Sequence, residues 1–211
     1  LFPYTTLFRS ALAGDPYYQD FFFLRDEPTD WLSKFGGSAW SPFGDTGKYY
    51  LHLFDVTQAD LNWRNPYVRE ELFKVVNFWR DKGVKGFRFD VINLIGKDEV
   101  LENCPENDGK PAYTDKTIVH DYLHMLNEAT FGQADSFITV GEMSATTIEN
   151  CILYTDPARH ELSMAFNFHH LKVDYENGQK WSLKKFDFEE LKHLFHTWGK
   201  EMSDHEDRKS V

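Results

Sequence analysis

The sequence lacks several features that whole classes of protein require. It has a formal net charge of −11 and no Lys/Arg cluster, so it has no dense positive charge for nucleic acid or an anionic membrane. No apolar run approaches the roughly 20 residues that span a bilayer, and the first residues lack the layout of a signal peptide. No glycine-rich phosphate loop supports a nucleotide-dependent function. These absences leave a globular protein that acts on a neutral or locally captured small molecule.

Cysteine is also scarce. Cys104 and Cys151 lie far apart without CxxC spacing and can form at most one bridge, so we expect free thiols in a reducing compartment. No cofactor and no metal are expected. His169 and His170 are a poor metal pair, because adjacent residues of a strand point to opposite faces and no third ligand is apparent.

The two ends of the chain read differently from its middle. Residues 1–10 (LFPYTTLFRS) back-translate to a common short-read sequencing adapter, and residues 207–211 (DRKSV) to the complementary adapter end. Because both matches have the right orientation, we interpret them as translated adapter, with an ordinary tail and loop as the alternative. The native stretch is then about 11–206, and it is expected to start and stop inside a domain.

Helix and strand patterns alternate along this stretch. Asn65 and Pro66 form the N-cap and N1 pair of an amphipathic helix that ends before Gly83. Further helices are expected near 114–131, 145–153 and 188–202, and strands near 86–94, 136–141 and 162–168. Residues 11–62, rich in Gly, Pro, Asp and aromatics, show short β-like pieces at 17–24 and 48–54.

This alternation predicts an α/β fold with a parallel sheet. An open doubly wound sheet and a closed barrel share the pattern, but the polar residues favour the barrel. Asp90, Asn93, Glu142 and His169 fall at the carboxyl ends of successive strands, where a (β/α)8 barrel builds its active site. Because only about three strand–helix units are present, we predict a partial (β/α)8 TIM barrel.

Asp90 and Glu142 are suited to glycoside cleavage with retention, which needs a nucleophilic carboxylate and a proton-donating one about 5 Å apart. Arg88 lies two residues before Asp90, and therefore on the same side of the strand, where it can hold that carboxylate ionised and oriented. Glu142 ends an apolar strand, a setting that suits a general acid. The spacing alone is equally compatible with an Arg–Asp ion pair and a loop-capping Glu.

Three motifs favour the catalytic interpretation. GFRFDVIN (86–93), TVGEM (139–143) and QADLN (58–62) resemble signature regions of the α-amylase family of glycoside hydrolases, family 13, and QADLN is similar to the QPDLN of its oligo-1,6-glucosidase branch, with Ala59 in place of Pro. The resemblance makes Asp90 the nucleophile, Glu142 the general acid/base and Arg88 the partner of the nucleophile. It also implies that residues 11–64 are the latter part of an inserted domain B, and that 65–206 hold about strands 4 to 6 of the catalytic barrel.

By the same resemblance, two family elements lie outside the sequence. One is the early motif whose Asn and His line the glucose subsite, and the other is the late motif whose Asp stabilises the transition state. The chain alone is therefore expected to be inactive. Val91 is the residue type that the branch shows when it does not favour α-1,4 bonds, and it is equally a residue that fills a strand.

Further segments resemble the members of the branch that hydrolyse trehalose 6-phosphate: FGGSAW (35–40), YYLHLF (49–54), FNFHHLKVDY (166–175) and GQKW (178–181). Lys172 and Lys180 follow a strand end, where the leaving sugar would lie, and offer point charges to a phosphate. His169 and His170 can add hydrogen bonds, and Asn93 is a further substrate-binding candidate. The alternative is that both lysines are solvated loop cations.

The predicted partner is thus a phosphorylated disaccharide, which implies a cytoplasmic location because such sugars form during uptake and stay inside the cell. Two other functions stay open. An oligo-1,6-glucosidase or dextran glucosidase would act on isomaltose instead. The non-catalytic heavy chains of amino-acid transporters resemble the family but lack a complete catalytic set, whereas Asp90, Glu142 and Arg88 are all present here.

Overall fold

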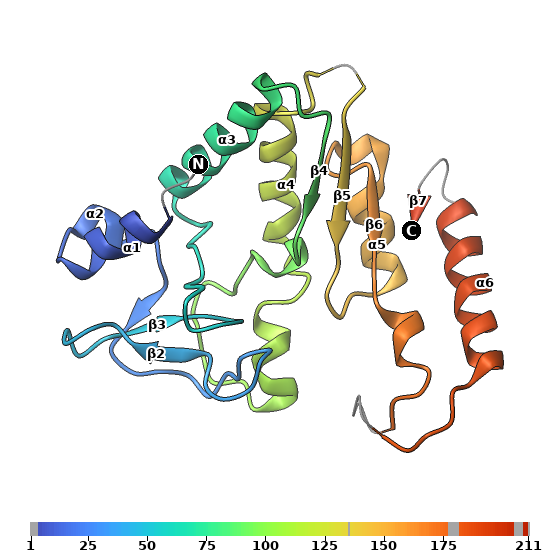
Figure 1. Cartoon of the computed structure of the whole chain (residues 1–211), viewed down its shortest axis with the longest axis horizontal. Coiled ribbons are helices and arrows are strands. Elements are labelled where there is room, and N and C mark those ends of the chain that lie inside the picture. The colour runs from blue at the N-terminus through green and yellow to red at the C-terminus, as the bar shows by residue number, and fades with distance from the viewer. Residues whose placement is uncertain (1–3, 135, 177–181, 205–208, 211) are drawn as a thin grey trace.

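The computed structural model of the chain describes residues 4–134, 136–176, 182–204 and 209–210. It has two parts that lie side by side: a small region of short strands and loops built from the first third of the chain, and a larger parallel sheet covered by helices (Figure 1).

The small region begins with two helices and continues as a three-stranded antiparallel sheet in the order β1-β3-β2. Its elements are α1 (Tyr4–Leu12), α2 (Pro16–Gln19), β1 (Leu24–Arg25), β2 (Trp40–Pro42) and β3 (Tyr49–Leu51). The β-like piece expected at 48–54 contains β3, but the one expected at 17–24 is wrong over most of its length. Asp15 caps the first turn of α2 through the amide of Tyr17, and Pro16 occupies N1, so the chain starts a helix there.

The packing of α1 involves residues of the adapter-like segment. Leu7 and Ala11 are buried, and the ring of Phe8 contacts the rings of Phe22 and Tyr50. Such packing does not bear on where those residues come from, so the adapter interpretation stays a prediction.

The larger region alternates strands and helices as the sequence predicts. The strands are parallel in the order β4-β5-β6-β7. They are β4 (Gly86–Phe89), β5 (Ile138–Glu142), β6 (Met164–Phe166) and β7 (Lys209–Ser210). The helices are α3 (Pro66–Asp81), α4 (Ile118–Ala129), α5 (Ile148–Thr155) and α6 (Phe188–Asp204). Four 3-10 turns complete the described elements: η1 (Ile92–Leu94), η2 (Glu106–Ala112), η3 (Pro157–Arg159) and η4 (His169–Lys172).

The helix α3 begins where the sequence predicts. The side chain of Asn65 accepts a hydrogen bond from the amide of Tyr67 at 2.9 Å, and Pro66 opens the first turn. Two expected strands are shorter than predicted. The strand expected at 86–94 ends at Phe89, because Val91 adopts a left-handed conformation (φ 40°) that leads into η1. The strand expected at 162–168 ends at Phe166, shortly before η4.

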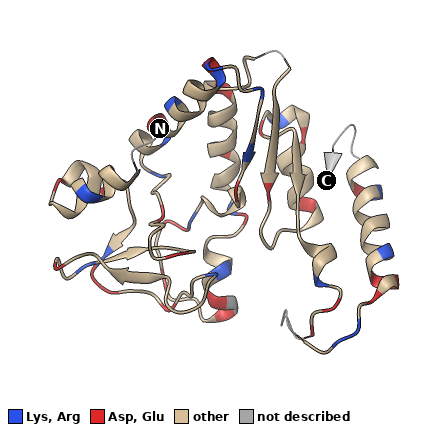
Figure 2. Ribbon diagram, viewed as in Figure 1, with Lys and Arg blue, Asp and Glu red and all other residues tan. Residues whose placement is uncertain are grey.

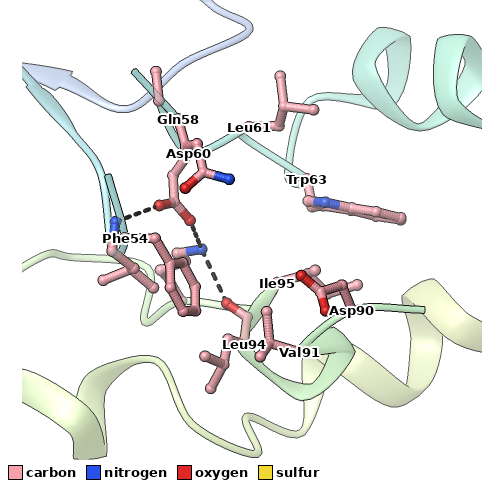
Figure 3. Close-up of a pocket in the computed structure, with 12 residues that line it drawn as sticks. Phe54, Gln58, Asp60, Leu61, Trp63, Asp90, Val91, Leu94 and Ile95 are labelled. Carbon is pink, nitrogen blue, oxygen red and sulfur yellow. Dashed lines mark hydrogen bonds and ion pairs between the residues drawn. The ribbon is translucent and has the colours of Figure 1, made fainter. Parts of the chain in front are cut away.

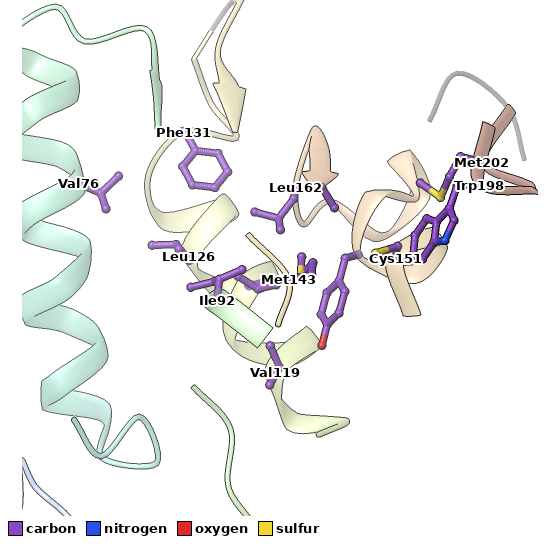
Figure 4. Close-up of a cluster of buried hydrophobic side chains, with 13 residues drawn as sticks. Val76, Ile92, Val119, Leu126, Phe131, Met143, Cys151, Leu162, Trp198 and Met202 are labelled. Carbon is purple, nitrogen blue, oxygen red and sulfur yellow. The ribbon is translucent and has the colours of Figure 1, made fainter. Parts of the chain in front are cut away.

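The two faces of the parallel sheet have different surroundings. Phe87 and Phe89 pack against a buried apolar cluster between the sheet and its helices, whereas Arg88, between them in the strand, projects from the opposite face. The cluster draws on every helix of the larger region, with Val76 from α3, Leu126 from α4, Cys151 from α5 and Trp198 from α6 among its members (Figure 4). The helices therefore hold one face of the sheet, and the other face is left to carry the polar strand ends.

Charged residues of both signs are distributed over the described part of the chain. Lys and Arg lie along the helices and loops, with acidic residues among them (Figure 2). No helix in the described residues is long and apolar enough to cross a bilayer.

Candidate active site

The candidate site is built at the carboxyl end of β4 and β5. These strands pair in parallel, and the register sets Arg88 beside Val140 and Phe89 beside Gly141. One step further along the same register, Asp90 follows Phe89 and Glu142 follows Gly141. Adjacent strands lie about 4.8 Å apart, so the register brings the two candidate carboxylates to the same level of neighbouring strands, and retaining glycosidases hold such a pair about 5 Å apart.

The guanidinium of Arg88 connects the two carboxylates. Its Nη1 lies 2.7 Å from Oδ1 of Asp90, and its Nη2 forms an ion pair with Oε2 of Glu142. Below the guanidinium is the ring of Phe166 on β6, with 5.6 Å between Cζ and the ring centroid. A planar, permanently charged group with several donors is suited to hold two carboxylates in a fixed relative position. The predicted contact between Arg88 and Asp90 is thus present, while the reach of Arg88 to Glu142 was not foreseen.

The surroundings of the two carboxylates differ strongly. The side chain of Asp90 is 72% exposed and that of Glu142 is 10% exposed. An exposed carboxylate is free to meet an incoming substrate atom, whereas a buried carboxyl is shielded from bulk water. This asymmetry matches the division of roles between a nucleophile and a general acid/base.

Asp90 lines a cavity of about 370 Å³ between the end of β4 and the small region. Val91 and Ile95 lie beside it, and Gln58, Asp60 and Leu61 of the QADLN motif come from across the cavity (Figure 3). Val91 is a β-branched residue in the left-handed region, which is rare and costs about 1–3 kcal/mol. This backbone turn sends the chain away from the strand immediately after the nucleophile candidate.

The QADLN motif connects the small region to the loop that follows β4. Asp60 accepts a hydrogen bond from the amide of Leu53 at 2.8 Å and forms an ion pair with Lys97, Nζ to Oδ1 2.6 Å. Lys97 is 1% exposed and also donates to the carbonyl of Leu94 at 3.0 Å (Figure 3). The motif therefore has a structural role at the rim of the cavity.

Asn93 occupies a different position from the predicted one. Its side chain has no exposed surface, and its amide donates to Asp115 and to the carbonyl of Ser144 while its oxygen accepts from the amide of Ser144. A side chain whose donors and acceptor are all used inside the protein has nothing left for a ligand. The substrate-binding role predicted for Asn93 is replaced by an internal one.

The His-His-Leu-Lys segment forms η4 rather than the end of a strand. The ring of His169 packs on Trp198 and that of His170 on Phe195, both on α6. Burial, followed by the charge of Lys172, lowers the pKa of His169. The rings therefore face a helix, and the strand-based argument about their directions does not apply. Lys180 lies outside the described residues.

The charge of Lys172 acts on a second lysine, Lys34, which lies far from it in the sequence. Lys34 lies just before the FGGSAW motif, and its Nζ is 5.3 Å from the centroid of the Tyr113 ring. The backbone carbonyl of Lys110 accepts a hydrogen bond from the amide of Tyr113. Burial, then the charges of Lys110 and Lys172, lowers the pKa of Lys34 to about 8. Among the described residues, neither Lys34 nor Lys172 has a carboxylate within ion-pair distance. In the sequence, Lys34 stands directly before FGGSAW, and this position is the signal that could have identified it as a candidate site residue.

Within the described ranges no group of three His, Cys, Asp or Glu side chains could hold a metal ion. Cys104 and Cys151 are both free, and burial raises the pKa of Cys151 to about 12, so its thiol stays protonated at neutral pH.

Known proteins resemble the chain in both sequence and structure. The model of the alpha-amylase catalytic domain matches residues 4–210. Trehalose-6-phosphate hydrolase of Bacillus subtilis is 52% identical over 198 residues, 90% of this chain and 35% of the relative. The Escherichia coli enzyme of the same name is 50% identical over 200 residues, 92% of this chain and 36% of the relative. Oligo-1,6-glucosidase of Parageobacillus thermoglucosidasius is 42% identical over 204 residues, with coverages of 92% and 36%.

Solved structures give the same picture. The crystal structure of Bacillus licheniformis trehalose-6-phosphate hydrolase matches with a TM-score of 0.91 and 47% identity, over 97% of this chain and 38% of the other. Isomaltulose synthase from Klebsiella sp. LX3 matches with a TM-score of 0.86 and 32% identity, over 96% and 37%. The predicted partial (β/α)8 barrel is confirmed. The chain spans a little over a third of the length of the curated relatives it matches.

Proposed function

The chain belongs to the α-amylase family of glycoside hydrolases, and from this premise we propose that it forms the central part of an enzyme that hydrolyses trehalose 6-phosphate to glucose and glucose 6-phosphate. The observation that carries the proposal is the identity of 50–52% to two trehalose-6-phosphate hydrolases, against 42% to an oligo-1,6-glucosidase. The proposed site residues are Asp90, Glu142 and Arg88.

The proposed reaction proceeds in two displacements. In the first, an oxygen of Asp90 attacks the anomeric carbon of the glucosyl unit, the glycosidic C–O bond breaks, and Glu142 gives its proton to the departing oxygen. In the second, Glu142 takes a proton from water, the water oxygen attacks the same carbon, and the carboxylate of Asp90 leaves. Inversion at each step gives net retention of configuration. Arg88 keeps both carboxylates in place.

The phosphate would be held by the lysines that have no carboxylate partner in the described part of the chain. Lys172 follows β6, and Lys34 comes from the small region, and the charge of Lys172 contributes to the lowered pKa of Lys34. Cations held close together repel each other, which is unfavourable without a ligand and becomes favourable once a dianion sits between them. The lowered pKa of Lys34 supports this proposal. Lys180 is a further candidate from its position in the sequence, whereas His169 and His170 are weaker ones because their rings pack on α6.

A second candidate function is that of an oligo-1,6-glucosidase or glucan 1,6-α-glucosidase. Relatives with these names are about as fully aligned as the hydrolases, at 42% identity. Such an enzyme needs no phosphate site, and Lys34 and Lys172 would then be solvated cations. A non-catalytic transporter heavy chain is disfavoured because Arg88 contacts both candidate carboxylates, Asp90 and Glu142.

The substrate can be tested with the chain completed to full length by the flanking segments of its Bacillus subtilis relative. Trehalose 6-phosphate, isomaltose and 4-nitrophenyl α-glucoside are compared as substrates of this protein and of its Lys172→Met variant. The proposal expects trehalose 6-phosphate to have the highest kcat/KM, and the variant to raise KM for this substrate by at least about 10-fold while leaving the nitrophenyl glucoside unchanged. A preference for isomaltose, or equal effects of the variant on both substrates, would refute the phosphate role.

The cytoplasmic location is part of the same proposal. A phosphorylated disaccharide does not cross a membrane unaided, so an enzyme that consumes it is expected to work where the sugar phosphate is made. If the completed protein prefers isomaltose, this argument for the location disappears as well.

A further inference from the structure

The loops that follow the two catalytic strands are joined to each other through Asn93. Asn93 comes three residues after Asp90, and Ser144 comes two residues after Glu142. The Asn93 side chain donates to the carbonyl of Ser144 at 2.9 Å and accepts from its amide at 2.9 Å. This two-point contact extends the pairing of β4 and β5 past the ends of the strands, where no backbone ladder remains.

Asp115 holds Asn93 in the orientation that this contact needs. Its Oδ1 accepts from Nδ2 of Asn93 at 2.8 Å, and its amide donates to the carbonyl of Asn93 at 3.1 Å. The remaining acceptor capacity of the carboxylate is used by two side chains of α5, since Tyr154 donates to Oδ1 at 3.1 Å and Asn150 to Oδ2 at 3.0 Å. Asp115 itself has a left-handed backbone (φ 49°). One carboxylate therefore connects the loop after β4 with the helix that follows β5, and through Asn93 it also reaches the loop after β5.

The network requires an acceptor at this position. Asn93, Asn150 and Tyr154 all present donors to Asp115, so an amide in its place would set an NH2 group against at least one donor. Asn93 has no exposed surface and Tyr154 has none either. An unpaired donor in such a place is costly. The half-buried Asn150 can turn its amide to meet the new NH2 group, but the neutral oxygen left for Asn93 and Tyr154 is a weaker acceptor than the carboxylate, so Asn93 is held less firmly against Ser144.

We propose that Asp115 is a positioning residue that sets the separation of Asp90 and Glu142 through Asn93 and Ser144. The inference rests on the function proposed for those two carboxylates. Retaining catalysis depends on their separation, and a misplacement of about 1 Å can lower a rate by about 100-fold. Asp115 touches neither carboxylate, so its effect is expected in the rate of the chemical steps and not in the binding of the sugar.

The test compares Asp115→Asn with Asp98→Asn in the completed full-length protein. Asp98 lies in the same connection between β4 and α4 and forms an ion pair with Lys116, Oδ1 to Nζ 2.6 Å, but it takes no part in the network. Both variants lose one charge and one ion-paired or hydrogen-bonded carboxylate from this connection. A difference in kcat between the two variants is therefore due to the hydrogen-bond network around Asp115 and not to the loss of charge.

For Asp115→Asn we expect kcat to fall about 10- to 100-fold with KM within 2-fold of the parent, on trehalose 6-phosphate and 4-nitrophenyl α-glucoside alike. Asp98→Asn should keep the parent kcat. Equal kcat values for the two variants in an active parent would overturn the positioning role. A parent that is inactive on every α-glucoside would instead count against the proposed function.

Hydrogen exchange provides a second readout that does not depend on activity. The amide of Ser144 donates to Asn93, so its exchange should speed up in Asp115→Asn and stay unchanged in Asp98→Asn. If Asp115→Asn does not fold, the double variant Tyr154→Phe/Asn150→Ala removes two donors from Asp115 while leaving the carboxylate. A fall in kcat of at least about 3-fold is expected for it, and an unchanged kcat would overturn the proposal.

Discussion

Arg88 on β4 pairs with Glu142 at the end of β5, and the same guanidinium holds Asp90 at 2.7 Å. Two carboxylates that approach each other repel, and a shared cation between them reduces that repulsion. Arg88 thereby links the positions of the two groups on which the proposed mechanism depends.

The first prediction concerns Arg88. Arg88→Lys keeps a positive charge but cannot direct separate donors at Asp90 and Glu142, so kcat on trehalose 6-phosphate should fall by at least about 100-fold in the completed protein. The control is Arg80→Lys at the end of α3, where Arg80 pairs with Asp81 on the surface. A lysine variant at position 88 that retains the parent kcat would show that the shared guanidinium is dispensable.

The second prediction concerns Lys34 and pH. Its pKa is lowered from 10.5 to about 8 by burial and then by Lys110 and Lys172, so Lys34 is charged in the folded protein below about pH 8 and loses its charge above it. KM for trehalose 6-phosphate should therefore rise as the pH passes about 8, while KM for 4-nitrophenyl α-glucoside should not. Kinetics from pH 7 to 9.5 with Lys34→Met as the control measure this, and the variant should show no such rise.

The lowered pKa also has a consequence for stability. Between about pH 8 and 10.5 the unfolded chain keeps the Lys34 proton and the folded chain does not, so the contribution of this group to the free energy of unfolding increases with pH. Below pH 8 the charged form is unfavourable in the fold. Lys34→Met should therefore stabilise the protein at pH 7, by an amount that shrinks toward pH 10.5, as measured by urea unfolding. A destabilised variant at pH 7 would contradict the assignment.

The third prediction concerns the buried ion pair between Lys97 and Asp60. Lys97 is 1% exposed and Asp60 16%, so Lys97→Met leaves a carboxylate without its partner in a poorly solvated place. The free energy of unfolding should fall by about 3 kcal/mol or more. The matched control is Lys74→Met, which breaks the exposed pair of Lys74 with Glu71 and should cost less than about 1 kcal/mol. Similar losses of unfolding free energy for the two variants would mean that the Lys97–Asp60 pair is solvated.

The fourth prediction concerns the close approach of β4 and β5. A Cβ added at Gly86 would lie 2.7 Å from the carbonyl oxygen of Ile138, which is backbone and cannot move aside without disturbing the strand pair. Gly86→Ala should lower the free energy of unfolding by at least about 1–3 kcal/mol. Gly199 in α6 is the control, because a Cβ there meets nothing within 4 Å. Gly199→Ala should leave stability unchanged or raise it by up to about 1 kcal/mol.

Sequence patterns predict those features that depend on local signals. The helix α3 follows from Asn65, Pro66 and the apolar spacing after them, and the parallel order of strands follows from the alternation of elements. The contact between Arg88 and Asp90 follows from their separation by two residues in an extended strand. These features need no knowledge of which distant segments meet.

Features that depend on contacts between distant segments were missed or assigned wrongly. Asn93 looks like a site residue because it follows the nucleophile, but Val91 turns the chain so that Asn93 is buried against Asp115 and Ser144. Lys34 is more than a hundred positions from Lys172, and no periodicity connects them. The sequence places His169 at the end of an expected strand, whereas His169 and His170 lie in η4 with their rings packed on α6.

The account as a whole depends on Asp90 acting as the nucleophile, and trapping the covalent intermediate tests this most directly. The completed protein is incubated with 5-fluoro-α-glucosyl fluoride, which forms the glycosyl ester quickly and hydrolyses slowly, and its peptides are then analysed by mass spectrometry. The account predicts a fluoroglucosyl group on Asp90 in the parent and none in Asp90→Asn. A label on any other residue, or product released with inverted anomeric configuration, would contradict it.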